Sequence, residues 1–334
     1  MPSLLPMCKH YCTQKNALHI TMHIHNAAKN FHISLIIHTF GANLKQNQMK
    51  TTRCLSHAAG SHILFFILYI VAPALYAQRV EIIEPTLLEC EYYKRAVTDT
   101  LDRENDYKAD YARLRIGKNT SMFYYPQQLR WDSLCADPKK SALAFVEYSR
   151  KTGGKSIAGV FKGYVYKNFP EGKVTVFNGF ALMHWTYEEE WEKPQWELRD
   201  STKVILEYPC QLAVSHYRGR TWYAWFTFDI PISEGPWKLC GLPGLILEAF
   251  DKDKDYSFTA TGLNSSKEIH PVGIYDFRGN DWAKTTRQKY NEIRYKELHT
   301  DPTERMSTMY GLKRSEGKKE LKHRNYDFEE TDYH

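Results

Sequence analysis

Five side chains between residues 218 and 248 have the chemistry to hold a ligand. Three are the tryptophans Trp222, Trp225 and Trp237, and two are the cations Arg220 and Lys238. Indole rings offer a large apolar area with a polar edge, which suits an apolar ligand or a sugar. Cations beside them would steer an anionic ligand. With two nearby leucines, the candidate binding residues are Arg220, Trp222, Trp225, Trp237, Lys238, Leu242 and Leu245.

A purely structural role is the alternative for the same residues. Tryptophans commonly build the core of a sheet, and the cations can pair with neighbouring acids. Trp225 is the exception, because it lies on the mixed face of its strand, opposite the apolar set. It therefore faces either a cavity or a covering helix.

No catalytic motif stands in the chain after residue 77. The patterns G-x-S-x-G, H-E-x-x-H, the P-loop and G-x-G-x-x-G are all missing from this stretch, and its six histidines are scattered. We therefore predict no catalytic residue and no cofactor. A triad of residues distant in sequence stays open, since such residues need not be neighbours along the chain.

Two strands joined by an elbow position these side chains. From Trp222 to Ile230 the even positions are apolar, which predicts a strand with one buried face. A second strand is expected over Leu245–Phe250. Between them, Gly235-Pro236 and Pro243-Gly244 predict tight turns, with Gly244 in the positive φ of a type II turn.

The elbow ends in the motif Gly241-Leu-Pro-Gly-Leu-Ile246. With this motif the block resembles the GLPGLI family of exported gram-negative bacterial proteins, and the resemblance extends loosely over residues 85–265. It is carried further by Gly219-Arg220, Trp222, Ala224-Trp225, Ile230-Pro231 and Gly235-Pro236-Trp237-Lys238. The resemblance implies export and no particular reaction.

The first 77 residues predict processing rather than structure. Residues 1–48 hold six histidines without helical or strand periodicity, and we expect an upstream extension, with a histidine-rich metal tract as the alternative. Residues 49–77 have the order of a signal peptide: Lys50 and Arg53, then an apolar run over Ile63–Val71, then a small-residue end at Ala77. That run is shorter than the roughly 20 residues of a membrane span.

Charge balance excludes nucleic acid as an expected partner. Of the 45 basic residues, six lie in 1–77, which leaves 39 against 39 acidic residues. No transmembrane helix is expected in the mature chain.

Cysteine use suits an oxidising compartment. Four cysteines follow residue 77, and the pairs expected are Cys210 with Cys240, which flank the elbow, and Cys90 with Cys135 by default. No C-x-x-C spacing supports zinc. The run Asp251–Asp255 opens like a calcium loop, but Tyr256 stands where that loop needs glycine, so no metal is predicted.

The rest of the chain predicts a mainly β (α+β) fold, a large twisted antiparallel sheet or open half-barrel with one or two packing helices. Helices are expected over Lys139–Tyr148, after the cap Asp137-Pro138, and over Thr285–His299. The further strands expected are Leu87–Asp99, Tyr107–Lys118, Thr120–Tyr125, Ile157–Lys167, Lys173–Tyr187, Trp196–Leu198, Lys203–His216 and Tyr256–Leu263, with a connector at Arg199-Asp-Ser-Thr202.

A single domain is expected over residues 78–311, with a charged flexible tail over 312–334. The function expected is that of an exported, non-enzymatic protein of the periplasm or outer membrane, which binds an apolar or glycan ligand or an outer-membrane protein. The alternative is a periplasmic hydrolase acting on peptide or glycan.

Overall fold

The computed structural model describes residues 17–26, 29–38 and 79–333, apart from 153–159, 181–182, 267, 278, 280 and 301–326. The chain divides into two units, Met1–Ala74 and Leu75–His334. In the first unit, β1 (Ala17–Asn26) and β2 (Lys29–His38) form an antiparallel hairpin with His23 opposite His32. The expectation that this stretch lacks strand periodicity is therefore wrong. The predicted signal peptide, 49–77, lies outside the described residues.

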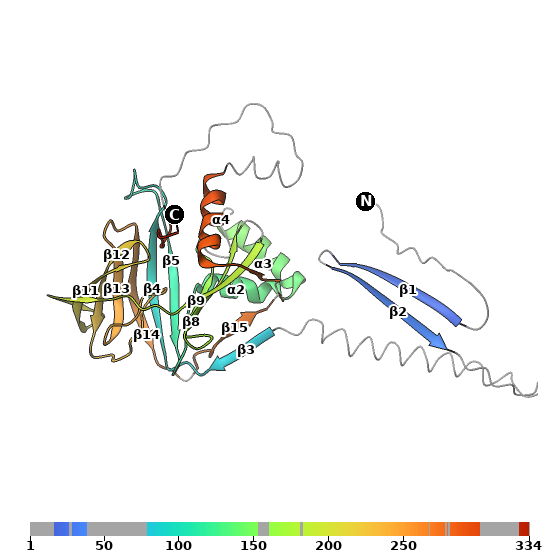
Figure 1. The fold of residues 1–334 in the computed structure, drawn as a ribbon, viewed down its shortest axis with the longest axis horizontal. Helices are drawn as coiled ribbons and strands as arrows, with labels where there is room; N and C mark the ends of the chain where they lie inside the picture. The colour runs from blue at the N-terminus through green and yellow to red at the C-terminus, as the bar shows by residue number, and fades with distance from the viewer. Residues whose placement is uncertain are drawn as a thin grey trace, which may run out of the picture. The chain divides into compact units, whose positions relative to one another are not determined.

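The second unit is built on one sheet of twelve strands, which is open rather than closed into a barrel (Figure 1). Its order is β10-β11-β12-β13-β14-β4-β5-β6-β7-β8-β9-β16, antiparallel throughout except for the pair β16 and β9. The prediction of a large, mainly β, antiparallel fold is confirmed. The strands are β4 (Leu88–Val97), β5 (Tyr107–Ile116), β6 (Ser121–Tyr124), β7 (Tyr164–Lys167), β8 (Lys173–Phe180), β9 (Met183–Glu190), β10 (Glu197–Ile205), β11 (Tyr208–Tyr217), β12 (Arg220–Thr227), β13 (Leu245–Asp251), β14 (Tyr256–Asn264) and β16 (Ala283–Lys284).

A small second sheet and three helices complete the described part of this unit. The small sheet pairs β3 (Arg79–Glu84) with β15 (Val272–Asp276), and neither strand was expected. The helices are α2 (Pro126–Cys135), α3 (Pro138–Thr152) and α4 (Arg287–His299).

Each of the two predicted helices begins after a side-chain cap, and of these caps Asp137 is the one predicted from the sequence. The carboxylate of Asp137 accepts the backbone N–H groups of Lys139 at 2.9 Å and Lys140 at 3.3 Å. The hydroxyl of Thr286 likewise accepts the N–H of Lys289 at 3.3 Å. These contacts satisfy donors that a helix leaves open in its first turn. Helix α2 was not expected, and no side chain caps its start.

Several strand boundaries differ from the prediction. Of the strand expected over Ile157–Lys167, the described part begins only at Tyr164. The single strand expected over Lys173–Tyr187 is the hairpin of β8 and β9. Residues 199–202 lie inside β10, where the register with β11 shifts, rather than in a turn. The turn falls instead at Leu206 and Glu207, with φ of 48° and 68°. Residues of these types rarely adopt positive φ, so the sequence carries no turn signal there.

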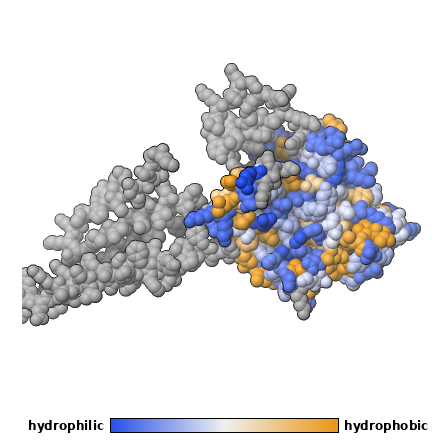
Figure 2. Space-filling view, turned by 180° about the vertical axis from the view of Figure 1, so that it is seen from behind, coloured by the Kyte–Doolittle hydropathy of each residue, from blue (hydrophilic) through white to orange (hydrophobic). Residues whose placement is uncertain are grey.

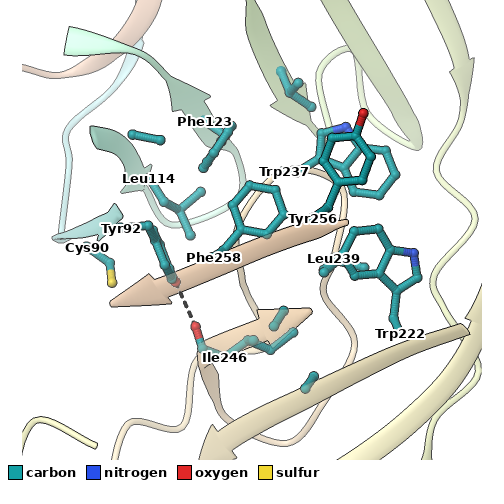
Figure 3. Packing of buried hydrophobic residues seen from close by; sticks show 14 of the residues in the cluster. Cys90, Tyr92, Leu114, Phe123, Trp222, Trp237, Leu239, Ile246, Tyr256 and Phe258 are labelled. Atoms are coloured by element: carbon teal, nitrogen blue, oxygen red, sulfur yellow. Dashed lines mark hydrogen bonds between the residues drawn. The ribbon is translucent and has the colours of Figure 1, made fainter. Parts of the chain in front are cut away.

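The core lies around β12, β13 and β14. Trp222, Ala224 and Phe226 are fully buried, which confirms the predicted alternation, although the strand ends at Thr227 and Phe228 is exposed. In Figure 3 the ring of Phe258 lies between those of Tyr92 and Tyr256, and the Tyr92 hydroxyl donates to the Ile246 carbonyl at 2.7 Å. Burial of these rings contributes to the apolar stabilisation of the unit.

The end of the chain packs onto the domain. Residues 327–333, which we call the clasp, bury Phe328, Glu330 and Tyr333 to exposures of 4%, 4% and 7%. The predicted flexible tail is therefore wrong for the clasp, because its acids meet buried cations that are remote in sequence. Residues 312–326 lie outside the described residues.

The surface is mixed in character. Figure 2 shows hydrophobic patches interspersed with hydrophilic residues on one face of the molecule. Among the described helices, none combines the length and apolar character needed to cross a membrane.

Candidate functional site

A cavity of about 310 Å³ lies between the large sheet, helix α4 and the clasp. Aromatic rings from several elements form much of its wall: Tyr125, Phe161, Tyr187, Trp237, Tyr256 and Tyr290. Five cations also line it: Lys94, Lys108, Lys162, Lys238 and Arg294. Among the described lining residues, the acids are Glu329 and Glu330 of the clasp, and there is no histidine, serine or cysteine. This composition suits binding of an anion with an apolar body.

Lys94 on β4 is one of two deeply buried cations that face the clasp. Its side chain is 2% exposed, and its ammonium donates to the Tyr125 hydroxyl at 2.9 Å and to the Glu329 carboxylate at 2.6 Å. The same group lies 4.4 Å from the centre of the Phe161 ring. Burial alone would lower the pKa of Lys94, but Glu329 and Tyr125 reverse this and raise it, so the lysine is charged.

Lys238 holds the second clasp carboxylate. Its side chain is 1% exposed, forms ion pairs with Glu189 on β9 and with Glu330, and donates to the Tyr187 hydroxyl at 3.1 Å. Burial opposes charge on Glu330, but Lys238 and Arg287 outweigh it and lower the pKa of Glu330. Arg287 and Asn291 of α4 donate to the same carboxylate at 2.9 and 3.1 Å.

Arg294 is a cation with spare hydrogen-bonding capacity. Its guanidinium lies 3.9 Å from the centre of the Phe328 ring, and within the described part of the chain it has neither an ion pair nor a side-chain hydrogen bond. Burial acts to lower the pKa of Arg294, and nearby Tyr290 and Glu329 raise it. Because a guanidinium carries five donors, Arg294 can bind a further carboxylate or phosphate.

The predicted binding residues separate into three groups. Trp237 and Lys238 line the cavity, and the Trp237 ring packs 5.6 Å from that of Trp222. Trp222, Leu242 and Leu245 are buried in the core and are absent from the lining. Of the binding residues predicted in the elbow, the cavity lining therefore includes Trp237 and Lys238.

Trp225 and Arg220 lie away from the cavity wall. Trp225 is half-buried on the other face of β12, where the Lys203 ammonium lies 4.5 Å from the centre of its ring. Arg220 pairs with Asp251 at 2.8 Å and donates to the backbone carbonyl of Phe328 at 2.8 Å. Arg220 therefore anchors the clasp rather than lining the cavity.

The elbow, residues 231–244, is a structural element. Lys167, fully buried, donates to the carbonyls of Gly235 at 2.6 Å and Leu239 at 3.3 Å, and forms an ion pair with Glu234 at 2.5 Å. A Cβ at Gly235 would lie 2.8 Å from the side chain of Ile246. The residue is glycine because the chain packs too closely there for any side chain.

The turn predicted at Gly244 is wrong. Positive φ occurs instead at Trp237, at 54°, and Gly241, at 96°. A Cβ at Gly244 would lie 1.9 Å from the carbonyl oxygen of Thr227, so this glycine permits close approach of two backbones. Pro236 is buried at the start of a turn closed by its carbonyl and the Leu239 N–H at 3.0 Å, whereas Pro243 is exposed.

The predicted disulfides are not formed. Cys90, Cys210 and Cys240 are free thiols, so neither the pair Cys210 and Cys240 nor the pair Cys90 and Cys135 is bridged. The thiol of Cys210 donates to the Tyr208 carbonyl at 3.4 Å. Burial raises the pKa of Cys90 to about 12, which keeps it protonated. Flanking the same hairpin in sequence does not bring two side chains together.

One group of acids in the described chain has metal-like geometry. Asp251, Asp253 and Asp255 have ligand oxygens within 4.8 Å of one another. However, Arg220 pairs with Asp251 at 2.8 Å and Arg103 with Asp255 at 2.7 Å. These two guanidinium groups offset two of the three carboxylate charges, so ion pairs hold Asp251 and Asp255 in place.

Sequence reasoning missed Lys94, Arg294, Glu329 and Glu330. The lysine and the arginine carry no motif, because their role comes from packing of distant elements. The signal that the clasp did offer is composition, since Phe328 and Tyr333 are aromatic residues that a solvated tail would not need.

Comparison with known proteins gives limited matches. No curated protein matches the chain. Two solved structures of PNGF-II, in space groups C2 and P21, are 15% and 13% identical to it, with TM-scores of 0.42 and 0.41. The matches cover 63% and 64% of this chain and 33% and 34% of theirs, so the chain spans about a third of their length. Residues 217–248, which include the elbow, match the model of a bacterial family described as "Protein of unknown function (Porph_ging)".

Proposed function

We propose that the protein is an exported envelope binding protein of the GLPGLI type, without enzymatic activity, which holds a ligand bearing an acidic group in the cavity under α4. One observation carries this proposal: the cavity has both an aromatic wall and buried cations. The acidic residues in its lining come from the clasp. The signal-peptide pattern of residues 49–77 supports a location in the periplasm or at the outer membrane.

The acidic group would be bound by Arg294 and Lys94. Arg294 brings donors that no described acid occupies, and Lys94 brings a charge in a site with little water. Charge-assisted hydrogen bonds are stronger than neutral ones, and more so away from water. The aromatic wall would pack against the rest of the ligand, whether apolar or sugar-like.

The proposal is tested by native mass spectrometry of the protein purified from its own envelope. We expect the wild-type protein to carry a bound ligand with an ionisable acid. The Arg199→Gln variant should retain this ligand, and the Arg294→Gln variant should lose it while its melting temperature stays unchanged. Arg199 is a matched control, because it is an exposed arginine paired with Glu197 on β10. A wild-type protein without ligand, or equal retention by both variants, would contradict the proposal.

A further inference from the structure

The clasp is held by the domain in the way that a bound peptide is held. Its residues form no helix or strand, and its main chain is recognised at three points. Arg220 donates to the Phe328 carbonyl at 2.8 Å, and the Tyr256 hydroxyl donates to the Asp327 carbonyl at 2.6 Å. The Thr331 N–H in turn donates to the Arg218 carbonyl at 3.0 Å.

The side chains of the clasp supply an aromatic anchor and three ion-paired carboxylates. The Phe328 ring packs under Arg294. Glu329 binds Lys94, Glu330 binds Lys238 and Arg287, and Asp332 binds Arg287 at 2.6 and 3.1 Å. Each carboxylate therefore meets a cation contributed by β4, the elbow or α4.

The receiving surface is shaped for a peptide backbone. A Cβ at Gly219 would lie 2.2 Å from the Thr331 hydroxyl and 2.9 Å from the Asp332 nitrogen. Gly219 has a φ of 82°, so glycine here both forms the turn before β12 and makes room for the incoming chain. Gly219, Arg220 and Lys238 all lie within the segment 217–248 that matches the family model.

We propose that this surface is a docking site for an acidic peptide segment of a partner protein, with an aromatic residue followed by two glutamates. The clasp occupies the site in cis as its competitor. The inference rests on the proposed function and names the ligand class. A peptide is favoured over a small anion because the three main-chain hydrogen bonds recognise amide groups, which a small anion does not carry.

Because the clasp occupies the site in the same chain, it lowers the apparent affinity of the site for a partner peptide. The clasp belongs to the same chain as the surface, so its binding is intramolecular and competes with any peptide added in trans. A peptide in trans reaches only the fraction of molecules whose clasp is open, and its apparent affinity falls by that fraction. Weakening the clasp should therefore tighten binding in trans.

The test uses the full chain and a labelled peptide, Asp-Phe-Glu-Glu-Thr-Asp-Tyr, followed by fluorescence anisotropy. We expect the double variant Glu329→Gln and Glu330→Gln to bind this peptide at least about tenfold more tightly than wild type. Adding Lys94→Met to the double variant should abolish the gain, as should a peptide with glutamines in place of both glutamates. Glu190→Gln, which removes the exposed ion pair with Lys173, is the control and should bind like wild type.

Several results would overturn the proposal. One is equal binding by wild type and a folded double variant. If that variant does not fold, Phe328→Ala, which keeps both carboxylates, takes its place, and equal binding then has the same meaning. Concentration-dependent dimers of wild type, dissociated by the peptide, would assign the site to a second copy instead of a partner. If the peptide does not bind but native mass spectrometry still finds the retained ligand, this inference is overturned and the proposed function stands.

Discussion

Two buried lysines, Lys167 and Lys94, have different roles in this molecule. Lys167 is fully buried, and Glu234 and the elbow carbonyls surround its ammonium. Lys94 is almost as buried, but its one carboxylate partner, Glu329, lies 235 residues away in the clasp. A buried charge without partners costs several kcal/mol, so each lysine needs the groups around it.

The difference lies in whether the partners can leave. The elbow connects β12 to β13, and its Leu239 and Leu242 are buried in the core, so it cannot withdraw from Lys167 without opening the core. The clasp is a seven-residue segment whose departure would leave the sheet paired as before. The elbow is therefore a structural use of a buried cation, and the site facing the clasp is a recognition surface.

The largest contrast should come from removing each lysine. Lys167→Ala leaves Glu234 and two carbonyls buried without a donor, and we expect it to lower the free energy of unfolding by about 3–5 kcal/mol. Lys94→Ala should cost clearly less, because Glu329 can leave with the clasp and regain water. Urea unfolding of both variants measures the difference. Equal losses of unfolding free energy in the two variants would contradict the difference between the elbow and the clasp.

Acid should weaken the clasp. Burial would raise the pKa of Glu329, but Lys94 and Arg294 prevail and lower it from 4.5 to about 2. Because the folded-state value is the lower one, this stabilisation is complete above about pH 4.5 and is lost as the pH falls toward 2. The shift corresponds to roughly 3 kcal/mol. Stability measured from pH 5 to pH 2 should fall less steeply for Glu329→Gln than for wild type. Identical slopes would show that Glu329 is not bound as described.

Two glycines sharpen the same contrast. Gly244→Ala would place a Cβ against the Thr227 carbonyl and should lower global stability by about 1–3 kcal/mol through overpacking. Gly219→Ala meets the clasp and also strains a φ of 82°, so limited proteolysis should cut residues 327–333 faster, with a smaller fall in melting temperature than for Gly244→Ala. The comparison fails if Gly219→Ala lowers the melting temperature as much as Gly244→Ala.

The smallest effect is expected at Trp225. This side chain is half-buried on the face of β12 away from the cavity, against Lys203. Trp225→Ala should leave peptide binding unchanged, whereas Trp237→Ala should weaken it, because Trp237 lines the cavity. Anisotropy titrations of the two variants decide this, and a larger loss at Trp225 would place the ligand on the opposite face.

The sequence predicted what local chemistry controls. Alternation in β12 and the cap at Asp137 are read within a few residues, and the structure bears them out. The turn at Leu206-Glu207 was missed because tertiary pairing forces positive φ on residues that do not favour it.

The candidate site was predicted only at its Trp237-Lys238 corner. Lys94 and Glu329 come together through a contact across the whole domain, and no spacing in the chain encodes it. The tail was misjudged for the same reason, since acids next to basic residues in sequence resemble a solvated segment whatever they meet in space.

Native-state hydrogen exchange tests the central claim most directly. The Thr331 amide, bonded to Arg218, reports on the clasp, and the Ile246 amide, bonded to Glu234 at 3.0 Å, reports on the elbow. We predict that the Thr331 amide exchanges through a local opening a few kcal/mol easier than global unfolding, and that Glu329→Gln makes only this opening easier. Exchange of both amides with the same free energy would show that the clasp opens only when the domain unfolds, and would contradict the account.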